Sequence, residues 1–305
     1  MRLTLALVAF VLWAHPSLVG LPLAALLVAA PGRDRSGRAG RALPLAGLIG
    51  AASLTLLVLG TGDGSRLTAV TAAYITLVTA AFVCGVLLRG GPFLREAFWA
   101  MGAAAVATAF LIQVLWGTDG WGQLAWEATR QAGLTMRYIV ERVPDAFNAY
   151  EPVVRVVALT WPGILALQTL AGLAIAWQLH QRITSAALGA PLARFRDFSI
   201  GDLWVWGIVA WLGVLILPVS QTLEIAGTNL GLVAGTLYVL RGAAIVVTFA
   251  EAFGVSVNAL VIAAGAAAAL ALPLLFVLPG LCTLGITDTW YQYRRRLAER
   301  RTNAT

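Results

Sequence analysis

The sequence predicts an all-α integral membrane protein: a polytopic helical bundle of about seven to nine membrane segments, with one amphipathic extramembrane helix. Of its 305 residues, 60% are hydrophobic and only 11% are charged, whereas soluble domains carry about 25% charged residues. Several separate apolar stretches approach the roughly 20 residues that a helix needs to cross a bilayer. The arginines stand mainly at the ends of these stretches, as they do in membrane proteins.

The net charge of +7 comes entirely from arginine, because the chain contains no lysine. A nucleic-acid-binding protein would gather these arginines on one solvated face. Here they flank apolar runs, so the positive-inside rule predicts that the basic loops and the C-terminal tail face the cytoplasm. The predicted partners are therefore the lipid bilayer and, in addition, a membrane protein or a small solute, but no nucleic acid.

The first 115 residues predict the following elements in order. Residues 3–30 are apolar but interrupted by His15-Pro16, so they form either one kinked helix or two short ones. The basic segment 31–42 is expected in the cytoplasm. Membrane segments are predicted at 43–60, 68–88 and 97–115. The turn-rich residues 61–65 separate the first two, and the short loop 89–96 precedes the third.

Residues 116–151 form the predicted extramembrane segment. Apolar residues recur there at helical spacing, and they are Trp121, Leu124, Ala125, Ala128, Ala132, Met136, Ile139, Val140 and Val143. Polar and charged residues occupy much of the opposite face. This pattern predicts an amphipathic helix that lies either on the membrane or on the bundle, and that Pro144 ends.

Further membrane segments are predicted at 152–179, 204–219, 229–250 and 256–281, with a basic linker at 180–202. The transmembrane domain then covers 1–282 and a basic tail covers 283–305. This count gives seven crossings between two basic regions that should both face the cytoplasm, which requires an even number. The short segment 204–219 and the arginine-containing segment 229–250 are the two most open to revision.

Arg241 is the most unusual residue inside a predicted span. An arginine at the bilayer centre costs about 3 kcal/mol, so it needs a carboxylate, a ligand anion or a path to water. Glu224, Glu251 and Asp288 are the nearby acids in the sequence. Alternatively, the helix is shorter than predicted and Arg241 extends its side chain to an interface.

The polar residues of the spans suggest a cavity. Gln113, Gln168, Asn229 and Arg241 would line a site for a small solute, with Arg241 binding an anionic group; the alternative is hydrogen bonding between helices. Catalytic motifs, paired carboxylates in one span and metal-ligand spacings are absent from the sequence. We therefore expect no enzyme activity, no metal and no cofactor.

The C-terminal residues Leu284-Gly285-Ile286-Thr287-Asp288-Thr289-Trp290-Tyr291-Gln292-Tyr293-Arg294 resemble the end of the YybS-like bacterial membrane proteins, a predicted family of unknown function. The segments Trp161-Pro162-Gly163-Ile164, Phe195-Arg196-Asp197-Phe198 and Gly242-Ala243-Ala244 are also similar. The matched motif positions are Pro162, Gly163, Gly242, Gly285, Asp288, Trp290 and Arg294. The family is expected to have an uncharged polar residue at the position of Arg241.

The hydropathy of this family is similar to that of the S components of energy-coupling-factor vitamin transporters. The resemblance implies a protein of the bacterial inner (cytoplasmic) membrane, built as a helical bundle with a small-molecule pocket. The leading expectation is a small-solute binding or transport-like membrane subunit. The alternative is a non-catalytic partner or assembly protein that docks through Trp121–Val143 and the arginine tail. Arginines of the tail would attract anionic headgroups, with Asp288 as a salt-bridge or helix-capping partner of a nearby arginine.

Overall fold

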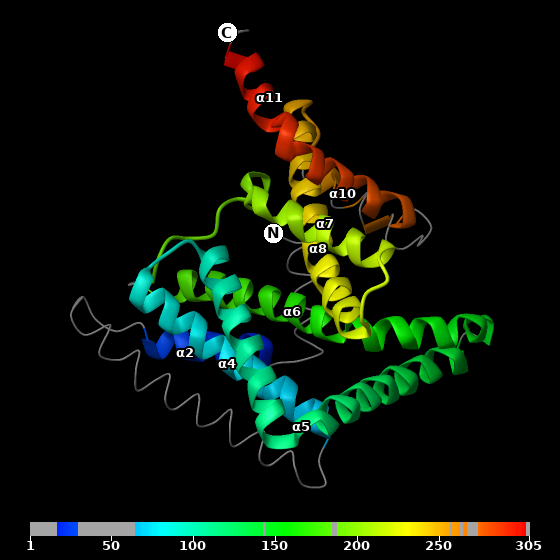
Figure 1. Cartoon of the computed structure of the whole chain (residues 1–305). Helices are drawn as coiled ribbons and strands as arrows, with labels where there is room; N and C mark the ends of the chain where they lie inside the picture. Colours follow the sequence, from blue (N-terminus) through cyan, green and yellow to red (C-terminus); the bar gives the residue numbers. More distant parts are fainter. Residues whose placement is uncertain are drawn as a thin grey trace. The chain divides into compact units, whose positions relative to one another are not determined.

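The structure is a computed structural model that describes residues 17–29, 65–142, 144–184, 188–256, 258–260, 262, 265–266 and 274–302 (Figure 1). These residues are almost entirely helical and include no β-strand. The chain divides at residues 192 and 193 into two compact units, called here the N-terminal unit and the C-terminal unit. The predicted segments 31–42 and 43–60 lie outside the described residues, as do parts of 3–30 and 256–281.

The N-terminal unit consists of helices α2 (Ser17–Ala29), α4 (Arg66–Arg89), α5 (Phe93–Arg142) and α6 (Tyr150–Ile183), with the 3₁₀ helix η1 (Pro144–Ala149) between the last two. Local signals in the sequence set the ends of α4. Ser65 caps its N-terminus by accepting a hydrogen bond from the Thr68 amide. Gly90 ends it in the left-handed conformation, with φ of 61°, which glycine adopts at little cost.

Helix α5 contains a sharp bend at Gly117, whose φ is 62° and ψ is −154°. A residue with a Cβ atom adopts this conformation only at a cost in free energy, so the position favours glycine. The bend separates an apolar helix at 93–116 from the amphipathic helix at 118–142. The second helix ends at Arg142 and Pro144 begins η1, as the sequence predicts.

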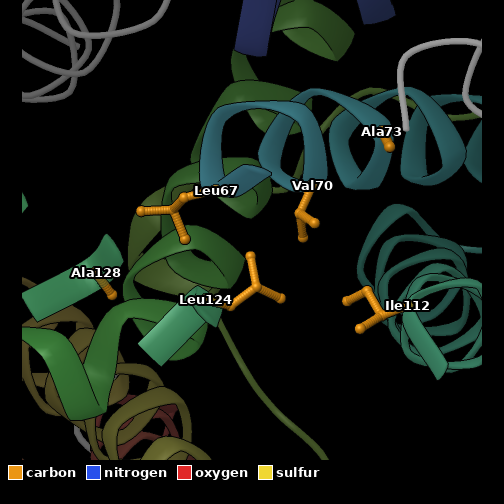
Figure 2. Packing of buried hydrophobic residues seen from close by; sticks show 6 residues of the cluster. All are labelled: Leu67, Val70, Ala73, Ile112, Leu124 and Ala128. Atoms are coloured by element: carbon orange, nitrogen blue, oxygen red, sulfur yellow. The ribbon is translucent and has the colours of Figure 1, made fainter. Parts of the chain in front are cut away.

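Part of the apolar face of the amphipathic helix packs into the core of the N-terminal unit: Leu124, Ala128 and Met136 are buried, whereas Trp121 and Ile139 are exposed. Figure 2 shows the buried cluster, formed by Leu67, Val70, Ala73, Ile112, Leu124 and Ala128. Ile112 precedes the bend and Leu124 and Ala128 follow it, so the bend folds α5 back onto α4. The buried part of this face therefore lies on the bundle, which is one of the two predicted locations.

The C-terminal unit contains the 3₁₀ helices η2 (Phe195–Asp197) and η3 (Asp202–Trp204), followed by α7 (Val205–Ile216), α8 (Gln221–Ala252), α10 (Leu274–Tyr291) and α11 (Tyr293–Thr302). Helix α7 packs against small residues of α8. A Cβ atom at Gly231 would overlap the Trp211 ring, and one at Gly227 would overlap Val214. Gly235 has open space beside it, so it does not serve this contact.

Two glycines bring α8 and α10 together. A Cβ atom at Gly242 would overlap the backbone of Leu281, and one at Gly285 would overlap the backbone of Tyr238. Helices approach this closely only where small residues remove the side chains between them. Helix α10 continues to Tyr291, so the boundary predicted at 282/283 falls inside a helix, and the separate tail helix begins only at Tyr293.

Four helices in the described part of the chain are long and apolar enough to cross a membrane, namely α4, α5, α6 and α8. This supports a helical membrane protein but not the predicted seven to nine segments. The predicted span 204–219 needs correction, because α7 has only 12 residues and rises about 18 Å, against a hydrocarbon core of about 30 Å. Leu217, the residue before Pro218, is extended and ends α7 before the helix is long enough to cross the bilayer.

Candidate functional site

Asp288 is a buried acid at the centre of a group of charged residues in the C-terminal unit. Its Oδ2 atom accepts hydrogen bonds from Arg241 Nε at 3.1 Å and from an Arg294 guanidinium nitrogen at 3.4 Å. Its Oδ1 atom accepts the Tyr293 amide at 3.0 Å and so caps the start of α11. Only 4% of the Asp288 side chain and 8% of the Arg241 side chain are exposed. Salt bridging and helix capping were predicted as alternatives for Asp288, and it does both.

Arg241 and Arg294 extend this group to the linker before α7. Arg241 Nη1 lies 3.6 Å from Asp202 Oδ1 and 3.3 Å from Thr289 Oγ1. Arg294 Nη1 donates to the carbonyl oxygens of Arg196 and Phe198 at 3.0 and 2.9 Å. We call Asp202, Arg241, Asp288 and Arg294 the Asp288 cluster. It connects the linker, α8, α10 and α11, which are separated by up to 98 residues in sequence.

The structure assigns different roles to the three acids that the sequence offered to Arg241. Asp288 pairs with it directly. Glu251 instead pairs with Arg196 at 3.1 Å. Glu224 stands in the first turn of α8, 17 residues and therefore about 25 Å along the helix axis from Arg241. Arg241 is thus buried and paired within the protein, rather than extended to an interface along its own helix.

The four residues predicted to line a solute cavity are distributed over both units. Arg241 and Asn229 lie on α8, 12 residues and about 18 Å apart along its axis, and Asn229 Nδ2 donates to the Ile225 carbonyl at 2.8 Å. Gln113 accepts a hydrogen bond from Trp121 Nε1 at 3.1 Å across the bend in α5. Gln168 is partly buried on α6. A single cavity formed by all four residues stays a prediction.

A pocket lies elsewhere, in a helical hairpin of the N-terminal unit. We call residues 118–142 of α5 and 150–161 of α6 the hairpin. Tyr150 Oη donates to the Gly133 carbonyl at 3.4 Å and ties its two helices together. Between them runs a groove of about 260 Å³, lined by Leu67, Ala128, Gln131, Ala132, Thr135, Met136, Ile139, Val153, Val154, Val157 and Trp161. None of the four predicted ligand residues lines it.

The exposed surface of residues 126–142 in the hairpin, called here its outer face, carries two aromatic residues, each with an arginine stacked on it. Trp126 is 61% exposed and Tyr138 is 53% exposed. The Arg130 guanidinium lies 5.4 Å from the Trp126 ring centroid, and that of Arg142 lies 4.0 Å from the Tyr138 ring centroid. Since Trp, Tyr and Arg dominate the binding energy of protein interfaces, this composition is typical of a docking surface.

Sequence reasoning missed a contact that fixes the hairpin to α4. The Glu127 carboxylate accepts the Leu67 and Arg66 amides at 2.8 and 3.2 Å and the Ser65 hydroxyl at 2.8 Å. A carboxylate is favoured there because the first amides of a helix lack internal partners and carry partial positive charge. Glu127 reads in the sequence as one more polar residue on a solvated face, so no local signal identifies it.

A second missed feature holds the chain after α6. The buried His180 ring accepts the Leu188 amide at Nε2 at 3.2 Å, and Trp177 Nε1 donates to the Ala190 carbonyl at 3.1 Å. Gly189, with φ of 66°, packs directly under the Trp177 ring. His180 therefore has a structural role in this unit. Within the described residues, no group of three or more His, Cys, Asp or Glu side chains could hold a metal ion.

The motif positions of the family resemblance fall into three settings. Gly242, Gly285, Asp288 and Arg294 meet in the C-terminal unit, as the helix contact and the Asp288 cluster. Trp290 is exposed near the end of α10. Pro162 and the buried Gly163 lie within α6. These four residues hold α8, α10 and α11 together: the two glycines allow the helices to approach closely, and Asp288 and Arg294 form an ion pair.

No protein-family model, curated protein or solved structure matches the chain. The YybS-like resemblance therefore stays a prediction, and the structure itself is the basis for any functional inference.

Proposed function

We propose that this chain is a non-catalytic, multi-pass membrane protein of the bacterial inner membrane, which binds a protein partner through the outer face of its hairpin. The observation that carries this proposal is the pair of exposed aromatic residues, Trp126 and Tyr138, each with an arginine stacked on it. An arginine over an aromatic ring keeps both side chains ordered before binding, which lowers the entropy cost of association.

The internal pairing of polar residues also supports a docking role over solute transport. A transport site would use Arg241 as the anchor for an anionic solute, but its guanidinium is already neutralised by Asp288 and faces Asp202. Asn229 lies about 18 Å from Arg241 along α8, a separation that does not favour one compact site for both residues. We therefore favour the partner or assembly function, and we keep solute binding as the competing hypothesis.

The partner is best sought by photo-crosslinking in living cells. A photoreactive amino acid replaces Trp126 or Tyr138 one at a time, and a matched variant carries it at Trp206, which is similarly exposed but belongs to the C-terminal unit. We expect one discrete protein adduct from positions 126 and 138 and none of that size from position 206. The adduct is identified by mass spectrometry, and binding is then measured with the purified partner.

Two results would contradict the proposal. Adducts with lipid alone at positions 126 and 138 would make the outer face a membrane-contacting surface. An Arg241→Gln variant that folds but loses uptake or binding of a defined small solute would restore the transport hypothesis. Because Trp126 and Tyr138 are exposed, Trp126→Gln and Tyr138→Gln variants should fold normally and serve as the binding-deficient controls.

A further inference from the structure

Helix α11 is a short, strongly basic helix whose position is fixed by the Asp288 cluster. Over residues 293–302 it contains five arginines and one glutamate, a net charge of +4. The break before it is sharp, because Gln292 adopts a positive φ of 46°. Asp288 then caps the new helix at the Tyr293 amide. The tail is therefore a folded element joined to α10 in one defined direction.

The arginines at the start of α11 divide into two kinds. Arg294 turns inward, toward Asp288 and the linker carbonyls. Arg295 and Arg296 are exposed, and the Arg296 guanidinium lies 5.9 Å from the centroid of the Tyr291 ring. That ring stacks on Tyr293 with centroids 5.7 Å apart. Arg295 and Arg296 are therefore exposed next to the stacked rings of Tyr291 and Tyr293.

The residues next to these arginines indicate at which depth of the membrane this surface lies. Helix α10 is apolar over most of its length and ends in the exposed residues Trp290 and Tyr291. Tryptophan and tyrosine are enriched at the level of lipid headgroups, where an apolar ring can be buried while its polar edge stays hydrated. Exposed arginines directly beyond such a pair lie at the depth of the phosphates.

We propose that the junction of α10 and α11 is a binding surface for anionic phospholipid headgroups. Arg295 and Arg296 pair with the lipid phosphates, and Trp290 and Tyr291 lie among the headgroups. The charge is complementary to an anionic bilayer, and arginine matches phosphate by donating two parallel hydrogen bonds. Asp288 positions the surface by capping α11 and by turning Arg294 away from it. This site is independent of the hairpin and of its partner.

Hydrogen exchange of the full-length protein in lipid nanodiscs tests the proposal. The amides of residues 293–302 are followed in nanodiscs of phosphatidylcholine alone and of phosphatidylcholine mixed with phosphatidylglycerol. We expect exchange to be about tenfold slower in the anionic bilayer, since each bound arginine contributes to the attraction, and this protection should decrease as salt screens the charges.

Two matched variants assign the effect to specific side chains. The double variant Arg295→Gln/Arg296→Gln should exchange equally fast in both bilayers. The double variant Arg137→Gln/Arg155→Gln removes two exposed arginines from the N-terminal unit and should keep the full protection. Unchanged exchange in α4 and α8 shows that each variant is folded.

Equal exchange of the native protein in the two bilayers would overturn the proposal. So would protection that survives in the Arg295→Gln/Arg296→Gln variant. If a soluble acidic peptide protects α11 in phosphatidylcholine nanodiscs as strongly as phosphatidylglycerol does, the surface belongs to a protein partner and the lipid assignment fails.

Discussion

The N-terminal unit and the C-terminal unit are both built from apolar helices, yet different interactions hold their helices together. In the N-terminal unit, aliphatic side chains of α4 and α5 pack in one cluster (Figure 2), and Phe82, Phe93 and Trp177 form a second, aromatic contact. In the C-terminal unit, glycines let α8 and α10 touch at the backbone, and the Asp288 cluster fixes α11 and the linker.

This difference shows how one apolar chain can use two kinds of specificity. Apolar packing tolerates substitutions that conserve volume, so the stability of the N-terminal unit should depend on the size of its buried side chains. A buried ion pair contributes little net stability but is strongly destabilising when one partner is lost. The stability of the C-terminal unit should therefore depend on single charges and on single methyl groups added at its glycines. The following predictions test this comparison, from the largest expected effect to the smallest.

Asp288→Ala should destabilise the C-terminal unit by about 3–5 kcal/mol, because it leaves the buried Arg241 guanidinium without its main partner. Hydrogen exchange should accelerate in α8 and α11 but not in α4. A double variant, Asp288→Leu/Arg241→Met, should recover most of the loss because both charges are gone. If the single variant is as stable as the native protein, the cluster does not hold this unit.

Leu124→Ala should destabilise the N-terminal unit by about 2–4 kcal/mol, through lost contacts and the cavity left in the cluster. Leu124→Met conserves volume and should cost much less. Thermal unfolding in detergent, read with hydrogen exchange in α4, measures both. Similar losses in the two variants would show that volume is not the property that matters at this position.

Gly242→Ala should cost about 1–3 kcal/mol, since the added methyl group pushes α8 away from the Leu281 backbone. Gly235→Ala on the same helix is the matched control, because its Cβ would meet open space. There the change should be neutral or slightly stabilising, as alanine favours helix over glycine. The comparison fails if the two substitutions change the unfolding temperature equally.

Glu127→Gln should have the smallest effect, about 1 kcal/mol, because the amide oxygen still accepts hydrogen bonds at the start of α4 but the charge is lost. Exchange of the amides of Arg66 and Leu67 should increase, while α8 stays unchanged. An unchanged rate at these two amides would show that the contact does not form in solution.

Much of the secondary structure could be predicted from local signals. The span predicted at 68–88 is α4 at 66–89, because Ser65, a continuous apolar run and Gly90 mark its start, body and end. The amphipathic helix and its end before Pro144 were likewise predictable. Helix α7 was not, since the apolar residues 204–219 continue past the point where the residue before Pro218 leaves the helical conformation.

The candidate sites were harder to predict, because they depend on contacts between distant residues. Arg241 was identified as a residue that needs a partner, yet the sequence offered three acids and could not rank them. Trp126 and Tyr138, the aromatic residues of the outer face, are not among the residues that the helical pattern singles out. That both stay exposed follows from the bend at Gly117, and glycine by itself does not reveal a bend.

By itself, the sequence determined that this is a helical membrane protein with a basic C-terminal end, since composition and apolar periodicity act locally and need no partner. It also identified Asp288 as a charge that an arginine must satisfy. Only the tertiary structure decided that this arginine is Arg241 together with Arg294, and that Gly242 and Gly285 allow the approach. The physical reason is range: helix formation depends on neighbours within a few residues, whereas pairing across 47 residues is set by how the helices pack.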